Sequence, residues 1–153
     1  MGDGPWVEVA TTVFSILLVI AALIDARTRR FPNALAVATA LTAVALVSLA
    51  MGCAAIPSRI MVALATCFSL VAFELLWRHL HDGAMGMGFG DLKALFPLLL
   101  VEPFAAIISL AVGLALLAIC CIALRRPSLP LLPFVVPCYL ALLIPASSLI
   151  ELV

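Results

Sequence analysis

The sequence predicts an all-α polytopic membrane protein, a bundle of six transmembrane helices whose short fourth helix follows a glycine-rich loop. The first observation behind this prediction is composition: hydrophobic residues make up 67% of the 153 residues and charged residues only 10%. A soluble domain is roughly half apolar and about a quarter charged. The second observation is a mean hydropathy of +1.35. Because so few polar residues cannot cover the molecule, lipid must cover part of it, and residues 1–153 are expected to form a single integral membrane domain.

Six apolar runs mark the expected helices, since a membrane-spanning helix needs about 20 mostly apolar residues. The runs are Trp6–Ile24, Phe31–Met51, Ile56–Leu80, Leu92–Val101, Phe104–Leu124 and Leu129–Ile150. The pair Glu102-Pro103 separates the fourth run from the fifth, because proline interrupts helical hydrogen bonding. The fourth run is too short to cross a bilayer of ordinary thickness. We expect residues of the preceding loop to extend it, or the bilayer to be thinner there.

The distribution of basic residues predicts the orientation, because lysine and arginine favour the cytoplasmic side of a membrane. With the N-terminus outside and six crossings, seven of the eight basic residues fall inside and only Arg59 falls outside. Treating the fourth and fifth runs as one helix would move Arg125 and Arg126 outside, so six crossings fit better than five. The zero formal net charge argues against a nucleic-acid partner, which would require a basic surface.

Two aspartates are the most informative ionisable residues, because charge inside a membrane is costly and commonly functional. The predicted topology places Asp25 at the inner end of the first helix and Asp91 at the inner end of the fourth, on the same membrane face. If they meet in a low dielectric, both cannot readily ionise, so one keeps a proton. The ionised carboxylate can then activate a water molecule while the protonated one polarises a peptide carbonyl, which is aspartic proteolysis.

Structural roles compete with this hypothesis. Asp25 could instead pair with Arg27 or Arg29 at the lipid interface, and Asp91 could cap the fourth helix. Four glycines at positions 83, 86, 88 and 90 favour a loop that lets a substrate strand approach closely, since glycine permits tight turns and close backbone contact. A flexible loop without a function is the simpler alternative, so the glycines alone are weak support.

Two segments around the aspartates carry a family resemblance. One is Gly86–Lys93, which reads GMGFGDLK, and the other is Ile24–Asn33, which reads IDARTRRFPN. Together they resemble the GxGD motif and the second aspartate segment of the type IV prepilin peptidases, a family of intramembrane aspartic proteases. The resemblance implies that Asp25 and Asp91 are the catalytic pair. It also implies an active-site loop, with no metal and no other cofactor. The loop residues are Gly88, Phe89 and Gly90. Lys93, two residues after Asp91, is a candidate substrate contact.

By this resemblance the chain is a membrane-embedded aspartic endopeptidase that removes the leader peptide of type IV prepilins at the cytoplasmic face of the inner membrane. Its expected partners are prepilins, membrane lipid and the pilus or type II secretion assembly machinery. The five cysteines form no CxxC pair, whereas larger members carry such pairs in an N-terminal methyltransferase segment. The chain is therefore most similar to the short branch that serves Flp-type (tight-adherence) pili. A small ion-coupled transporter with buried carboxylates and a structural subunit of a membrane complex are the alternatives.

The remaining polar features have simpler explanations. Lys93 is expected to be an ordinary inside-positive anchor if it neither contacts the substrate nor tunes the neighbouring aspartate. Glu74 and Arg78 have the spacing of an i,i+4 ion pair on the third helix. The His-x-His-Asp sequence at positions 79–82 offers too few ligands to favour a metal site.

Overall fold

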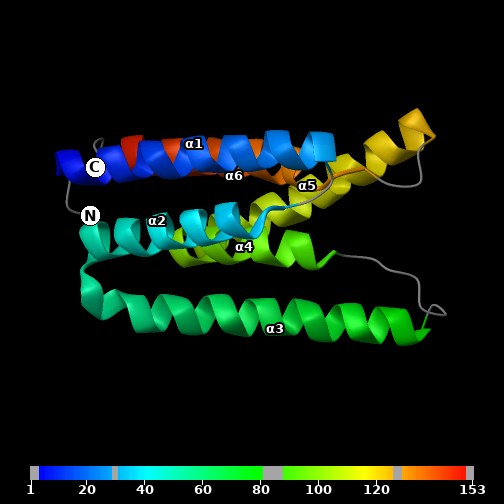
Figure 1. Ribbon diagram of the computed structural model, residues 1–153, viewed down its shortest axis with the longest axis horizontal. Helices are drawn as coiled ribbons and strands as arrows, with labels where there is room; N and C mark the ends of the chain where they lie inside the picture. The colour runs from blue at the N-terminus through cyan, green and yellow to red at the C-terminus, as the bar shows by residue number, and fades with distance from the viewer. Residues whose placement is uncertain (1–3, 29–30, 81–87, 126–128, 151–153) are drawn as a thin grey trace.

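The computed structural model describes residues 4–28, 31–80, 88–125 and 129–150, and this part of the chain consists of helices and short connections, with no strand. The elements in chain order are α1 (Pro5–Thr28), α2 (Asn33–Met51), the short 3-10 helix η1 (Cys53–Ala55), α3 (Ile56–Leu80), α4 (Phe89–Val101), α5 (Pro103–Leu124) and α6 (Leu132–Ile150). Successive α-helices run in opposite directions along one long axis (Figure 1). The predicted all-α bundle of six helices is confirmed.

The helices have the lengths and surfaces of a membrane protein. In the described residues α1, α2, α5 and the continuous η1–α3 segment are long and apolar enough to cross a membrane. Large apolar side chains cover their outer faces, and Phe68 and Phe104 are more than three-quarters exposed. The 13 residues of α4 span only about 20 Å at 1.5 Å per residue, against roughly 30 Å of hydrocarbon. This is the short fourth helix that the sequence predicted.

Two helix ends near the aspartates differ from the predicted ones. Helix α1 continues past Ile24 to Thr28, which places Asp25 inside its last turn. Helix α4 begins at Phe89 rather than at Leu92, so the end of the glycine-rich segment forms its first turn. Hydropathy cannot mark such ends, because glycine and charged residues in a terminal turn look the same as a loop. The other predicted boundaries agree to within a few residues.

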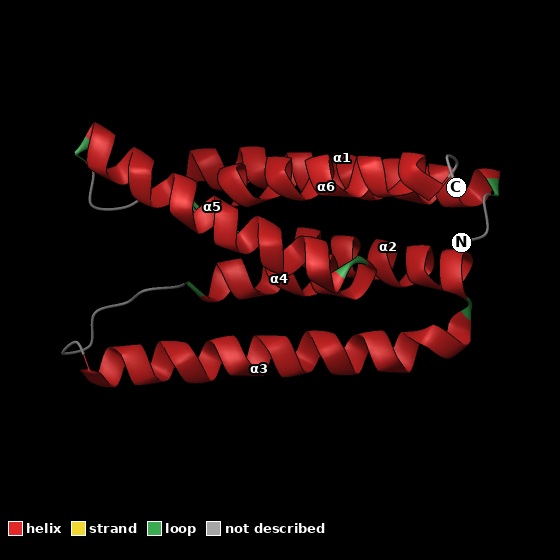
Figure 2. Ribbon diagram, turned by 180° about the vertical axis from the view of Figure 1, so that it is seen from behind, coloured by secondary structure: helices red, strands yellow, loops and turns green. Residues whose placement is uncertain are grey.

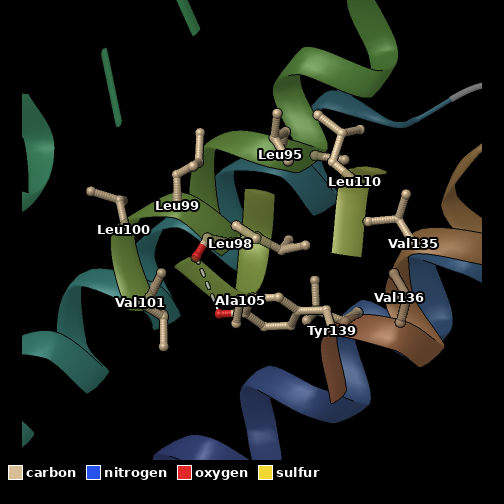
Figure 3. Packing of buried hydrophobic residues seen from close by; sticks show 14 of the residues in the cluster. Leu95, Leu98, Leu99, Leu100, Val101, Ala105, Leu110, Val135, Val136 and Tyr139 are labelled. Carbon is tan, nitrogen blue, oxygen red and sulfur yellow. Dashed lines mark hydrogen bonds between the residues drawn. The ribbon is translucent and has the colours of Figure 1, made fainter. Parts of the chain in front are cut away.

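The core of the bundle forms around α4, which is buried along most of its length. It packs against α2, α3 and α5, and more lightly against α6. Figure 3 shows the α4 leucines meeting side chains of α5 and α6. The Tyr139 hydroxyl of α6 donates a buried hydrogen bond to the Leu98 carbonyl oxygen at 3.1 Å. The buried side chains of this region are Ala94, Leu95, Leu98, Leu99, Leu100, Val101, Ala105, Leu110, Val135, Val136 and Tyr139.

The outer helices surround this core unevenly. Figure 2, seen from behind, shows α1 beside α6 and α2 beside α4, with α3 along one edge of the bundle. The contacts between helices agree with this view, because α1 packs against α2 and α6 while α3 packs mainly against α4. Helices α5 and α6 are in close contact at Gly113, where an added methyl group would lie 2.7 Å from Val135 Cγ2. Only a residue without a side chain fits between these two helices.

The end of α4 farthest from the aspartates is fastened by Arg59. Its Nη1 atom donates a hydrogen bond to the Val101 carbonyl oxygen at 3.2 Å and lies 3.9 Å from the Glu102 carboxylate. The predicted topology had placed Arg59 and Glu102 on the same side of the membrane. Their contact in the structure agrees with that placement and with a turn between α4 and α5 at this end.

Candidate active site

The structure buries one of the two aspartates and half-buries the other. Asp25, in the last turn of α1, is only 7% exposed, and its Oδ2 atom is shielded from solvent. Asp91 lies in the first turn of α4 and is partly exposed. Aspartate is almost never fully buried in proteins without a specific reason. The burial of Asp25 therefore indicates that its carboxyl group has a specific role at this end of α1.

The helix ends that carry the two aspartates lie at one end of the bundle. The C-terminus of α1 and the N-terminus of α4 lie on the same side (Figure 1), which is the arrangement of helices that the topology predicted. Burial has the larger electrostatic effect on the Asp91 carboxyl, and the charge of Asp25 has a smaller one. That the two carboxyl groups form one catalytic site stays a prediction.

The backbone orients the Asp91 carboxyl. The Gly88 N–H donates a hydrogen bond to Asp91 Oδ2 at 3.3 Å, and the Asp91 N–H donates to the Gly88 carbonyl oxygen at 3.1 Å. Gly88 is the residue that caps α4, and Asp91 is the third residue inside the helix. Asp91 therefore binds the first turn as a capping-box acid does. The alternative prediction from the sequence, in which Asp91 itself caps the helix, is wrong because Gly88 is the cap.

Two contacts join the segment that follows Asp25 to the segment that holds Asp91. A methyl group at Gly90 would lie 3.8 Å from Phe31 Cβ, so the first turn of α4 rests against the α1–α2 turn. Lys93 Nζ donates a hydrogen bond to Asn33 Oδ1 at 2.9 Å. The predicted substrate contact Lys93 thus has a partner within the protein. Sequence reasoning had left Asn33 without a role, although it ends the segment that carries the resemblance.

The aspartate end of α4 is recessed within the bundle. On that side both α3 and α5 extend beyond the first turn of α4 and beyond the end of α1 (Figure 1). Trp77, near the end of α3, stacks on Phe73 with ring centroids 6.4 Å apart, and aromatic residues favour the membrane–water interface. The helix ends that carry Asp25 and Asp91 are consequently set back from the ends of α3 and α5.

The glycines of the predicted active-site loop do not take the backbone conformation that only glycine allows. Gly88 has φ −81° and ψ 148°, which any residue can adopt. Among the described residues, Gly52 is the one glycine with positive φ. Phe89 and Gly90 belong to the first turn of α4 rather than to a loop. The described glycines act here through their small size, while positions 83 and 86 lie outside the described residues.

The other polar predictions can be checked in part. Arg78 Nε lies 2.8 Å from Glu74 Oε1, which confirms the i,i+4 pair. Within the described residues no group of three or more histidine, cysteine, aspartate or glutamate side chains is arranged to hold a metal ion. Residues 81–82 of the His-x-His-Asp sequence lie outside that part of the chain, as does Arg29.

The fold and the site together define a polytopic helical membrane protein with two aspartates on helix ends at one end of its bundle. Comparison with protein families gives the identity: the type IV leader peptidase family matches residues 12–125, which is most of the 153-residue chain. The chain belongs to that family, and this supports a prepilin leader peptidase-like function with prepilins as substrates. No curated protein and no solved structure matches the chain. The matched range contains both aspartates and every residue of the contacts that join them.

Proposed function

We propose that this protein is an aspartic endopeptidase in which Asp25 and Asp91 together hydrolyse one peptide bond of a type IV prepilin. The observation that carries the proposal is the placement of both aspartates at the same end of the bundle, in the last turn of α1 and the first turn of α4, within a chain of the type IV leader peptidase family. Among the other described residues at this end of the bundle, no second pair of carboxyl groups has a comparable placement. Residues 1–153 act as one peptidase domain in this proposal.

The chemistry follows from the pairing of two carboxyl groups. Because two negative charges repel strongly where water is scarce, the dyad works with one carboxylate and one carboxylic acid. The carboxylate takes a proton from a water molecule as the water oxygen attacks the scissile carbonyl carbon, and the acid donates its proton to the carbonyl oxygen. The tetrahedral intermediate then breaks its C–N bond, and the leaving amine takes a proton from the dyad.

The surroundings of the aspartates suit this reaction. Burial of Asp25 removes water that would otherwise weaken its electrostatic effect. The Gly88 N–H holds Asp91 Oδ2, which limits rotation of the carboxyl group and prepares it for a substrate. The helix ends that carry the two aspartates are set back from the ends of α3 and α5 (Figure 1), and in this proposal a peptide segment from a membrane-embedded helix approaches them from that end.

The finer assignments belong to the same proposal. The distribution of basic residues supports a cytoplasmic-membrane protein with its N-terminus outside and the aspartates at the cytoplasmic face. Flp-type prepilins as substrates, with pilus or secretion machinery as the downstream partner, belong to the same proposal and rest on the family resemblance of the sequence. The ion-coupled transporter receives no support from the structure beyond the buried carboxyl groups that the peptidase already explains.

Co-expression with an Flp-type prepilin from the same genome tests the proposal. Wild-type protein should remove the leader, seen as a mobility shift on a gel, and Asp25→Asn and Asp91→Asn should each abolish removal. Glu102→Gln is the matched control, since it neutralises a carboxylate at the opposite end of α4. Leader removal that survives in either aspartate variant would exclude that residue from the mechanism. A folded wild type that cleaves no prepilin would contradict the proposed substrate.

A further inference from the structure

We propose that the hydrogen bond between Lys93 and Asn33 is a positioning contact, which holds Asp91 at its working place opposite Asp25. This inference rests on the proposed peptidase function. Lys93 Nζ and Asn33 Oδ1 are 2.9 Å apart, although the residues are 60 positions apart in the chain. Lys93 is the only lysine of the sequence. The contact assigns it a role inside the protein in place of a substrate contact.

Asn33 is a rigid point of attachment. It is the first residue of α2 and follows Pro32, whose φ is −63° and is fixed by the pyrrolidine ring. The Pro32 carbonyl oxygen accepts a hydrogen bond from the Ala36 N–H at 3.0 Å. A side chain bound to Asn33 is therefore bound to the α1–α2 turn, and that turn begins directly after the α1 helix end that carries Asp25.

Asp91 lies between two residues that face the start of α2. On one side of it in the chain is Gly90, where an added methyl group would lie 3.8 Å from Phe31 Cβ. On the other side, Lys93 binds Asn33. The first turn of α4 is thus placed against residues 31–33, where α2 begins.

The first turn of α4 needs such support because the helix behind it is short and interrupted. α4 contains Pro97, which has no N–H to donate to the carbonyl group four residues earlier. That carbonyl group belongs to Lys93, so the intrahelical bond is missing at the residue that reaches across to α2. The side-chain contact compensates for the backbone hydrogen bond that this turn of the helix lacks.

A positioning role has a distinct kinetic signature. Both partners are exposed, so the bond contributes little to overall stability. A displacement of a catalytic group by about 1 Å can nevertheless reduce turnover roughly 100-fold. Loss of the contact should therefore lower kcat while KM for the prepilin and the unfolding temperature remain nearly unchanged.

A double-mutant cycle on the purified full-length protein tests this. Lys93→Met and Asn33→Ala should each lower kcat about 10- to 100-fold, and the double variant should be no worse than either single one. Lys93→Arg keeps a cationic donor and should restore most of the activity. Arg59→Met is the matched control, because it removes the cation that binds the other end of α4; it should leave kcat unchanged.

Three kinetic outcomes would overturn the inference. A raised KM with unchanged kcat in Lys93→Met, together with a silent Asn33→Ala, would make Lys93 a substrate contact. Effects that multiply in the double variant would show that the two residues act independently. An equal loss of kcat in Arg59→Met would show that any loosening of α4 has the same effect.

A spectroscopic readout separates this inference from the proposed function. Labelling lysine with 15N at Nζ gives one side-chain signal, because the chain has one lysine. Labelling aspartate carboxyl carbons gives four signals, and the Asp91 signal is the one that Asp91→Asn removes. Asn33→Ala should shift both the lysine signal and the Asp91 signal even if no prepilin is cleaved. An unchanged Asp91 signal would overturn the positioning role, whereas failure of the wild type to cleave prepilin would contradict only the function on which it rests.

Discussion

Phe31 and Gly90 lie against each other, although one follows Asp25 in the chain and the other precedes Asp91. A methyl group at Gly90 would be 3.8 Å from Phe31 Cβ, which is ordinary van der Waals contact. The position therefore has room for one carbon atom and for little more. The glycine of the family-like motif serves the packing of the two aspartate segments, and its effect on the reaction is open to direct test.

Gly90→Ala should keep leader-peptidase activity within a few-fold of wild type, whereas Gly90→Leu should lower it at least about 10-fold by pushing α4 away from the α1–α2 turn. Cleavage of a prepilin by the purified variants checks both. If Gly90→Ala alone abolished cleavage, the glycine would instead be needed for close approach of the substrate backbone, since no atom of the described residues obstructs the added methyl group.

Gly113→Ala should destabilise the protein by roughly 1–3 kcal/mol, because overpacking at a helix–helix contact forces backbone shifts. The added methyl group would meet Val135 Cγ2 at 2.7 Å and the Val135 backbone at 3.2 Å. Thermal unfolding in detergent measures the change. Val135→Ala should rescue only part of it, because the backbone contact remains. Gly4→Ala, in open space, is the control; an equal loss there would contradict the packing explanation.

Tyr139→Phe should cost no more than about 0.5–1.5 kcal/mol of unfolding free energy. It removes the hydroxyl donor, but the Leu98 carbonyl oxygen still accepts the Glu102 N–H at 3.1 Å. Tyr139→Ala should cost about 3–5 kcal/mol, as for other large aromatic side chains lost from a core. Denaturant or thermal unfolding distinguishes the two, and cleavage by Tyr139→Phe should match wild type. Similar costs for both variants would show that the hydrogen bond, not the ring, stabilises this contact.

Cys53 offers a test of orientation. It is an exposed free thiol in η1, at the end of the bundle opposite the aspartates. A membrane-impermeant maleimide should label it in intact spheroplasts if the N-terminus is outside. A cysteine placed at Thr28, next to the aspartate end, should be labelled only after permeabilisation. The reverse pattern would place the aspartates on the outer face.

The sequence predicts much of this fold because a bilayer demands long apolar helices. The six helices follow from apolar runs, and the shared end of Asp25 and Asp91 follows from counting crossings and basic residues. The Glu74–Arg78 pair follows from helical spacing alone. Local reasoning fails where a residue's role depends on a distant one: the partner of Lys93 is Asn33, and spacing along the chain cannot show this. It also misplaces the start of α4, because Phe89 and Gly90 are helical in the structure although neither residue carries a helical signal in the sequence.

The most direct test of the central claim is the rate of prepilin cleavage by purified Asp25→Asn, Asp91→Asn and the double variant. If the two carboxyl groups act as one catalytic unit, each single variant should lose at least about 100-fold in kcat. The double variant should then lose no more than the worse single one, since residues that act together are not additive. Unfolding temperatures near that of wild type would show that the loss is catalytic. Substantial cleavage by either single variant, with the protein folded, would contradict the account.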